Sequence, residues 1–90
     1  MITFDKNNDP TGELFDNWRR KNGNWYVLNV RPGGNIMLHR PNCFHFEFKA
    51  YGLKGNLSKN TKYCSQSKQE LEMLAQNRGV KNLKKCRTCL

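Results

Sequence analysis

The sequence predicts a small α+β domain, with a three- or four-stranded, largely antiparallel sheet and one main helix at about residues 67–78. Short segments rich in aromatic and β-branched residues alternate with turn formers between residues 25 and 64, which is typical of strands. A helical pattern with both a start and a stop signal follows. A length of 90 residues predicts one domain, 1–90, and we expect it to be a piece of a larger protein because it stops one residue after its last cysteine.

The best strand pattern is at residues 25–31, where aromatic and branched residues predominate. Residues 32–35 read Pro-Gly-Gly-Asn, a tight-turn sequence, so we expect residues 36–39 to return as the second strand of a hairpin. Phenylalanines alternate with other residues at 44–49, which predicts a half-buried third strand. Residues 61–64 predict a short fourth strand.

The remaining segments predict irregular structure. Turn-forming Asn, Asp, Pro and Gly residues dominate much of residues 5–24, although residues 13–20 have the spacing of a short helix. Residues 51–60 contain two glycines among lysines and asparagines, so we expect a basic loop there.

The main helix has recognisable ends. Ser67 and Glu70 have the spacing of a capping box, in which each residue satisfies a backbone N–H of the first turn. Gly79 is placed for a left-handed residue just beyond the helix, with Val80 packing back on the last turn. The expected buried stripe consists of Leu71, Leu74 and Ala75.

Two pairs of residues have the types and spacing of metal ligands. Cys86 and Cys89 form a Cys-x2-Cys pair, His39 and Cys43 form a His-x3-Cys pair, and 42 residues separate the two. Three thiolates and one imidazole make a closed tetrahedral Zn2+ site with no open position for water. The sequence therefore predicts a zinc-stapled domain, in which a structural metal supplements a small core.

Other residues compete for these positions. His45 could replace His39, because it forms a Cys-x-His pair with Cys43. A site of four thiolates, including Cys64, is also compatible with the composition, although Cys64 lies in a short apolar segment and is expected to be in the core. No signal peptide or run of about 20 apolar residues is visible, so we expect a reducing cytoplasmic location, where cysteines bind metals more often than they form disulfides.

The charge of the chain is strongly positive. The formal net charge is +9, and residues 17–90 hold fifteen of the 16 basic residues against three of the seven acidic ones. Such a balance favours a polyanionic partner, and we expect double-stranded DNA, with modified DNA as a further candidate. The candidate DNA-binding residues are Arg40, Lys54, Lys62, Lys81, Lys84, Lys85 and Arg87.

Within this set, Arg40 and Arg87 are the candidates for base readout, because a guanidinium can bind guanine through two hydrogen bonds. Trp18, Trp25, Tyr26 and Tyr51 are available to stack on an unpaired base, but in a domain of this size we expect such side chains to fill the core.

Residues 36–90 resemble the metal-binding N-terminal domain of the Ada-type DNA alkylation-repair proteins. The shared parts are an early ligand pair spaced x3, a strand, a helix with a Ser-x-x-Glu start, a glycine and a terminal basic Cys-x2-Cys. In that family the first ligand is the cysteine that accepts a methyl group, whereas His39 stands at the matching position here. The segments Leu-His-Arg-Pro-Asn-Cys and Tyr-Cys-Ser also look like small zinc modules attached to restriction-type nucleases.

Together these observations predict a zinc-stabilised DNA-binding module, as in the specificity domain of a restriction-type or DNA-repair protein that reads modified DNA. We expect no enzymatic activity, because the sequence shows no Ser-His-Asp order, paired carboxylates or Gly-rich phosphate loop. The alternatives are a zinc module that binds another protein and a domain whose thiolate removes methyl groups from DNA phosphates.

Overall fold

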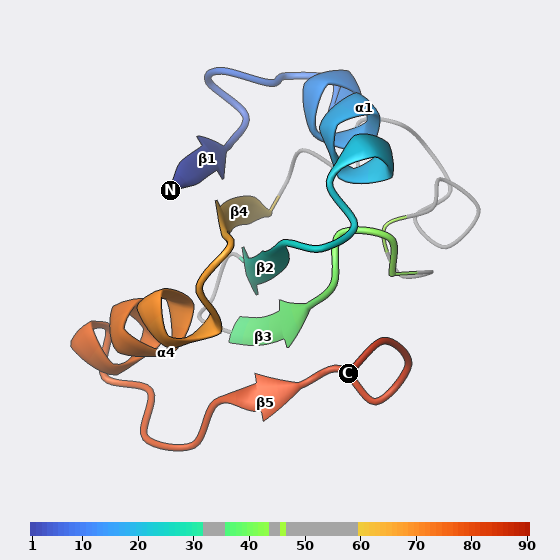
Figure 1. Cartoon of the computed structure of the whole chain (residues 1–90). Helices are drawn as coiled ribbons and strands as arrows, with labels where there is room; N and C mark the ends of the chain where they lie inside the picture. The colour runs from blue at the N-terminus through green and yellow to red at the C-terminus, as the bar shows by residue number, and fades with distance from the viewer. Residues whose placement is uncertain (32–35, 44–45, 47–59) are drawn as a thin grey trace.

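The computed structural model describes residues 1–31, 36–43, 46 and 60–90. Over these residues the chain forms two helices and a sheet of five strands in the order β1-β4-β2-β3-β5 (Figure 1). The elements are β1 (Ile2–Phe4), α1 (Glu13–Lys21), β2 (Tyr26–Val30), β3 (Ile36–His39), β4 (Thr61–Ser65), α4 (Lys68–Asn77) and β5 (Lys84–Lys85). The α+β class is confirmed.

The sheet is largely antiparallel, as expected, but it has five strands in the described ranges rather than three or four. The pairs β1–β4, β4–β2 and β2–β3 are antiparallel, and β5 pairs with β3 in parallel, so the sheet is mixed. The two additional strands, β1 and β5, have only three and two residues. Strands of two or three residues are stabilised by backbone pairing at the sheet edges. They are too short to show the alternating pattern by which a strand is predicted from sequence.

Several sequence expectations can be compared directly with the structure. The short helix expected at residues 13–20 is α1, and the main helix expected at 67–78 is α4 with its caps. The expected strand at 44–49 lies outside the described residues except for Phe46, whose N–H donates to the carbonyl of Cys43 in a tight turn rather than in a strand. The turn at 32–35 and the loop at 51–59 also lie outside the described residues.

The two helices cover opposite faces of the sheet. Val27 of β2 packs in a cluster with Phe15 of α1, whereas its neighbour Leu28 packs in a second cluster with Leu71 of α4. This division follows from the alternation of side chains along a strand. Figure 1 shows α1 and α4 on either side of the sheet, with β5 at the edge farthest from β1.

The start of α4 differs in detail from a standard capping box. The Ser67 hydroxyl accepts the N–H of Glu70 at 3.2 Å, as expected. The Glu70 carboxylate, however, accepts the Ser65 hydroxyl at 2.6 Å, and Ser65 in turn accepts the Ser67 N–H at 3.0 Å. One extra hydroxyl therefore completes the cap and links the end of β4 to the first turn of α4.

The end of α4 is the expected Schellman motif. Gly79 has a φ of +88°, a region that favours glycine, and the N–H of Val80 donates to the carbonyl of Ala75 at 3.1 Å. The chain then turns back along the sheet and enters β5.

Candidate metal centre

The parallel pairing of β3 with β5 brings the two predicted ligand pairs together. His39 is the last residue of β3, and Cys43 follows in the next turn. Cys86 directly follows β5, and its N–H donates to the carbonyl of Leu38 at 2.9 Å, which extends the pairing by one step. Because the strands run in the same direction, both pairs emerge at the same end of the sheet.

The four side chains form a compact group. One ligand atom from each of His39, Cys43, Cys86 and Cys89 lies within 4.8 Å of every other. The sulfur atoms of Cys43 and Cys86 are 3.7 Å apart, and the Cys89 sulfur lies 4.0 Å from Nδ1 of His39. A tetrahedral zinc with Zn–S bonds of about 2.3 Å would hold two sulfurs about 3.8 Å apart. The group therefore fits zinc in donor type, number and spacing.

The backbone around the group supports thiolate ligands. The N–H of Arg40 donates to the sulfur of Cys89 at 3.1 Å. Burial raises the pKa of the Cys89 thiol, and the Arg40 N–H acts in the opposite direction by stabilising the thiolate. Bound zinc would complete the deprotonation, because the metal binds the thiolate form.

Packing encloses most of the group. Cys43 and Cys86 are each 2% exposed and His39 is 4% exposed, while Cys89 is only partly buried. The ring of Phe46 lies edge-on to the imidazole of His39, with 4.9 Å between ring centres. A metal held here would be shielded from water, as is typical of a structural site.

The competing ligands have different positions. Cys64 is fully buried in the core cluster that contains Phe4 and Phe15, and it is not a member of the four-residue group. Burial raises its pKa to about 12, so it remains a neutral thiol. His45 lies outside the described residues.

The predicted basic residues are divided between surface and interior. Lys81, Lys84, Lys85 and Arg87 are exposed, and the guanidinium of Arg40 stacks over the ring of Tyr26 at 4.3 Å. Lys62, in contrast, is 1% exposed, and burial lowers its pKa to about 8. Its ammonium packs over Phe15 inside the protein, so it is not available to DNA on the surface. Lys54 lies outside the described residues.

The aromatic residues mostly fill the core, as expected. Trp18 contacts Trp25 with 5.3 Å between ring centres and Phe4 with 5.6 Å, and both tryptophans pack against the cluster on the α1 face. Tyr26 packs against the cluster on the α4 face. Tyr51 lies outside the described residues.

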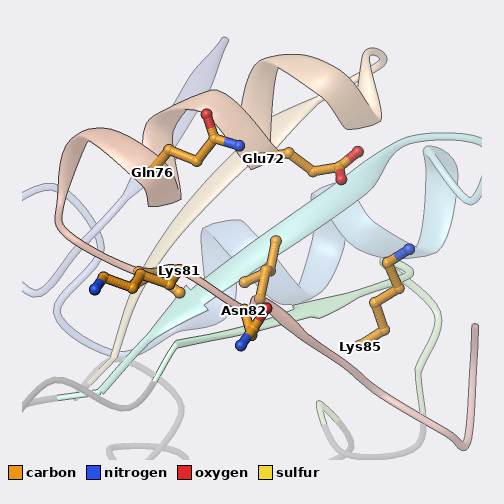
Figure 2. A pocket seen from close by; sticks show the side chains of 7 residues that line it. Glu72, Gln76, Lys81, Asn82 and Lys85 are labelled. Carbon is orange, nitrogen blue, oxygen red and sulfur yellow. The ribbon is translucent and has the colours of Figure 1, made fainter.

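Two surface hollows lie along β5, and one of them includes Cys86 of the metal centre. One, of about 520 Å³, is lined by Met37, Lys84, Lys85, Cys86, Arg87 and Thr88. The other, of about 240 Å³, lies between α4 and the segment that leads into β5, with Glu72 and Gln76 facing Lys81, Asn82 and Lys85 (Figure 2). Lys85 lines both hollows, so the basic surface continues from one to the other.

Comparison of the chain with protein-family models, with curated proteins and with solved structures finds no match. Among residues 1–31, 36–43, 46 and 60–90, no helix has the length and apolar character needed to cross a bilayer. What the chain does must therefore be inferred from its own residues.

Proposed function

We propose that this chain is a zinc-stabilised DNA-binding module. On the resemblance of its sequence, we propose that the module is the specificity domain of a restriction-type or DNA-repair protein. One observation carries the proposal: the four-residue His/Cys group lies within a basic surface. Arg40 follows His39, Lys85 precedes Cys86 and Arg87 follows it, so cations adjoin ligands from both halves of the site.

In this proposal zinc acts by holding two segments together. Arg40 belongs to the segment after β3 and Arg87 to the segment after β5, and a shared ion sets the spacing between them. Exposed lysines bind phosphates without regard to sequence, whereas the two arginines read bases. Arg40 is already oriented by Tyr26, which lowers the entropy cost of ordering it on DNA.

Salt-dependent binding tests the proposal. The zinc-loaded chain should bind a short duplex tightly at about 50 mM salt and much more weakly at about 200 mM, because phosphate contacts release counterions. A panel of duplexes with and without modified bases then measures selectivity. Equal or absent binding at both salt concentrations would reject a phosphate-binding function.

A second candidate function, the binding of another protein, is supported by one apolar surface. Met1 and Met73 are 57% and 56% exposed, and both line a hollow of about 410 Å³ beside α4 with Leu74. If the chain binds no duplex at low salt, this surface becomes the better guide to its partner.

We also expect no cysteine to accept a methyl group. All three cysteines of the group are assigned as zinc ligands, and His39 stands where the Ada-type family has its acceptor. Mass spectrometry after incubation with methyl-phosphotriester DNA should show an unchanged protein mass. A gain of one methyl group on Cys43, Cys86 or Cys89 would establish a repair activity instead.

A further inference from the structure

The hollow between α4 and the segment that leads into β5 has an apolar part that belongs to the core. Val80 and Leu83 line it, and both pack against the cluster that contains Leu71 and Ala75 of α4. The N–H of Val80 also donates to the carbonyl of Ala75 at 3.1 Å, which fixes the chain where it leaves the helix. The apolar part of the hollow is therefore held in place by the fold and not by flexible surface side chains.

The polar part of the hollow comes from two elements. Glu72 and Gln76 are one turn apart on α4, so their side chains lie on the same side of the helix. Lys81, Asn82 and Lys85 lie across the hollow from them, as Figure 2 shows. Within the part of the chain that the structure describes, no hydrogen bond engages the side-chain amide of Gln76 or of Asn82. Each amide therefore keeps donors and an acceptor for a ligand.

Glu72 is a carboxylate on an otherwise basic surface. Glu70 and Glu72 are the described acidic residues of the basic part of the chain, residues 17–90. The Glu70 carboxylate accepts the Ser65 hydroxyl in the cap of α4, whereas Glu72 is half-buried and lines the hollow. A carboxylate repels phosphates, so on a DNA-binding surface it weakens binding unless the ligand donates a hydrogen bond to it.

The lining matches the hydrogen-bonding edge of certain nucleobases. Glu accepts from the amino group of cytosine, and Asn or Gln bonds to the amino group and ring nitrogen of adenine. The hollow, of about 240 Å³, lies below the range of roughly 300–1,000 Å³ that drug-sized ligands occupy, so it suits a smaller group such as one base. A base stacked in a duplex has both of its faces covered, so only an unpaired base can place a face against apolar lining.

We propose that this hollow binds one unpaired nucleobase with an exocyclic amino group, cytosine or adenine. Glu72 accepts a hydrogen bond from the amino group, Gln76 and Asn82 bond to the edge of the ring, and a face of the base packs on Val80 and Leu83. The base comes from a single strand or is extruded from a duplex. Because the ligand belongs to a nucleic acid, the site rests on the proposed DNA-binding function, to which it adds three residues that the positive charge does not single out.

Lys85 connects this site to the rest of the basic surface. It lines the hollow beside α4 and also the neighbouring hollow along β5, together with Lys84 and Arg87. A nucleotide whose base lies in the first hollow can therefore place its phosphate at Lys85, with the strand continuing toward Arg87. This continuity favours a nucleic acid over a free nucleotide as the ligand.

Single-stranded oligonucleotides of equal length test the preference for amino-bearing bases. At one salt concentration the zinc-loaded chain should bind oligo(dC) or oligo(dA) more tightly than oligo(dT), by roughly fivefold or more. Gln76→Ala should reduce this preference. Gln69→Ala, the same substitution at an exposed position of α4 outside the hollow, is the control and should leave it unchanged.

Glu72→Ala separates base recognition from simple charge. Loss of the carboxylate should strengthen binding to oligo(dT), because phosphates are repelled less, whereas binding to oligo(dC) should strengthen less or weaken because the amino group loses its acceptor. The ratio of the two affinities should therefore fall. An equal gain for both oligonucleotides would mean that Glu72 acts only as a surface charge, and its role in the site would be overturned.

Deoxycytidine monophosphate provides a measurement that needs no DNA strand. In an NMR titration it should shift the side-chain amide signals of Gln76 and Asn82, and thymidine monophosphate should shift them less. A duplex with one unpaired cytosine, measured beside its fully paired counterpart and the single strand, then shows which source supplies the base. Equal binding of the unpaired and fully paired duplexes and the single strand would overturn the requirement for an unpaired base.

The outcomes distinguish this site from the function on which it rests. If the parent binds DNA with the expected salt dependence but Gln76→Ala and Glu72→Ala leave the base preference unchanged, the hollow is overturned and the DNA-binding function stands. If the mononucleotide shifts both amide signals and neither single strands nor duplexes bind even at low salt, the assignment to nucleic acid is overturned.

Discussion

Lys62 and Cys64 occupy alternate positions of β4 and both point into the core on the α1 face. Lys62 is 1% exposed with its ammonium 5.2 Å from the centre of the Phe15 ring, and Cys64 is fully buried. Burial lowers the pKa of Lys62 to about 8, against a smaller opposite effect of Asp9, and raises the pKa of Cys64 to about 12. Burial therefore disfavours the charged form of each group. As the pH rises, loss of the Lys62 charge increases the stability of the fold, whereas ionisation of Cys64 decreases it.

The cost of burying the Lys62 charge should depend on pH. Below about pH 8 the ammonium is charged in both the folded and unfolded states, and folding carries a cost of about 3 kcal/mol; above the unfolded pKa of 10.5 the lysine is neutral in both and the cost disappears. We therefore expect Lys62→Met to raise the free energy of unfolding relative to the parent most at pH 7–8. The difference in the free energy of unfolding between Lys62→Met and the parent should shrink by about 2–3 kcal/mol by pH 10.5.

Urea unfolding of the parent and Lys62→Met across pH 7–10.5 measures this difference. The comparison with the parent is needed because Cys64 also affects stability in this pH range. Its pKa is raised on folding, so its contribution to stability is complete below the unfolded pKa of 9.0 and is lost as the pH rises toward about 12. Lys21→Met, at the exposed end of α1, controls for the removal of one lysine. A difference that stays constant with pH would mean that the Lys62 charge is solvated in the folded state.

At the level of elements, the first turn of α1 is capped by a residue that precedes the helix in the sequence. Gly12 occupies the N-cap position with a φ of +81° and offers no side chain, and the buried carboxylate of Asp9 takes over the capping role. Its two oxygens accept the N–H groups of Leu14 and Phe15, both at 3.0 Å. One carboxylate thus satisfies two of the unpaired N–H groups at the helix start and fixes the position of Phe15 in the core.

We expect Asp9→Ala to lower the free energy of unfolding by about 2–3 kcal/mol, because it leaves two N–H groups at a partly buried helix start without an acceptor. The measurement is urea unfolding of the zinc-loaded chain. Glu13→Ala removes a negative charge from the same end of α1 at an exposed position and should cost much less. Similar losses for both variants would show that charge near the helix start matters more than the two hydrogen bonds.

On the scale of the whole molecule, the His/Cys group joins the end of β3 to the end of the chain. Only two residues of the C-terminal segment, Lys84 and Lys85, form strand β5, which is too short to hold an edge by itself. A metal held by the His/Cys group that follows it would therefore determine whether the last turn of the chain packs against β3. Removing zinc should release this edge and expose the cluster that contains Cys43 and Cys86.

We expect one zinc per chain and a loss of tertiary structure on chelation, since the energy of metal binding contributes directly to folding. Cys86→Ser should abolish stoichiometric zinc binding. Cys64→Ser, the same substitution at another buried cysteine, should keep the metal even though it places a hydroxyl in the core. Metal quantification with circular dichroism before and after chelator checks both. Full zinc content in Cys86→Ser, or its loss in Cys64→Ser, would overturn the assignment of the ligands.

The sequence by itself determined the features that depend on neighbours along the chain. The cap of α4 at Ser67, the turn at Gly79 and the two ligand pairs could be predicted because each signal spans only a few residues. The grouping of these four side chains was also predictable as a whole, since cysteines and histidines at metal spacing are rare and chemically specific.

Only the tertiary structure decided which residues meet across the fold. The same basic composition placed Lys62 in the core and Lys85 on the surface, because strand pairing and register determine the face to which each side chain points. The parallel β3–β5 pair and the capping of α1 by Asp9 join residues distant in sequence or separated by irregular chain. Local sequence patterns do not predict such contacts, because the energy of these contacts comes from packing and strand pairing that exist only once the chain has folded.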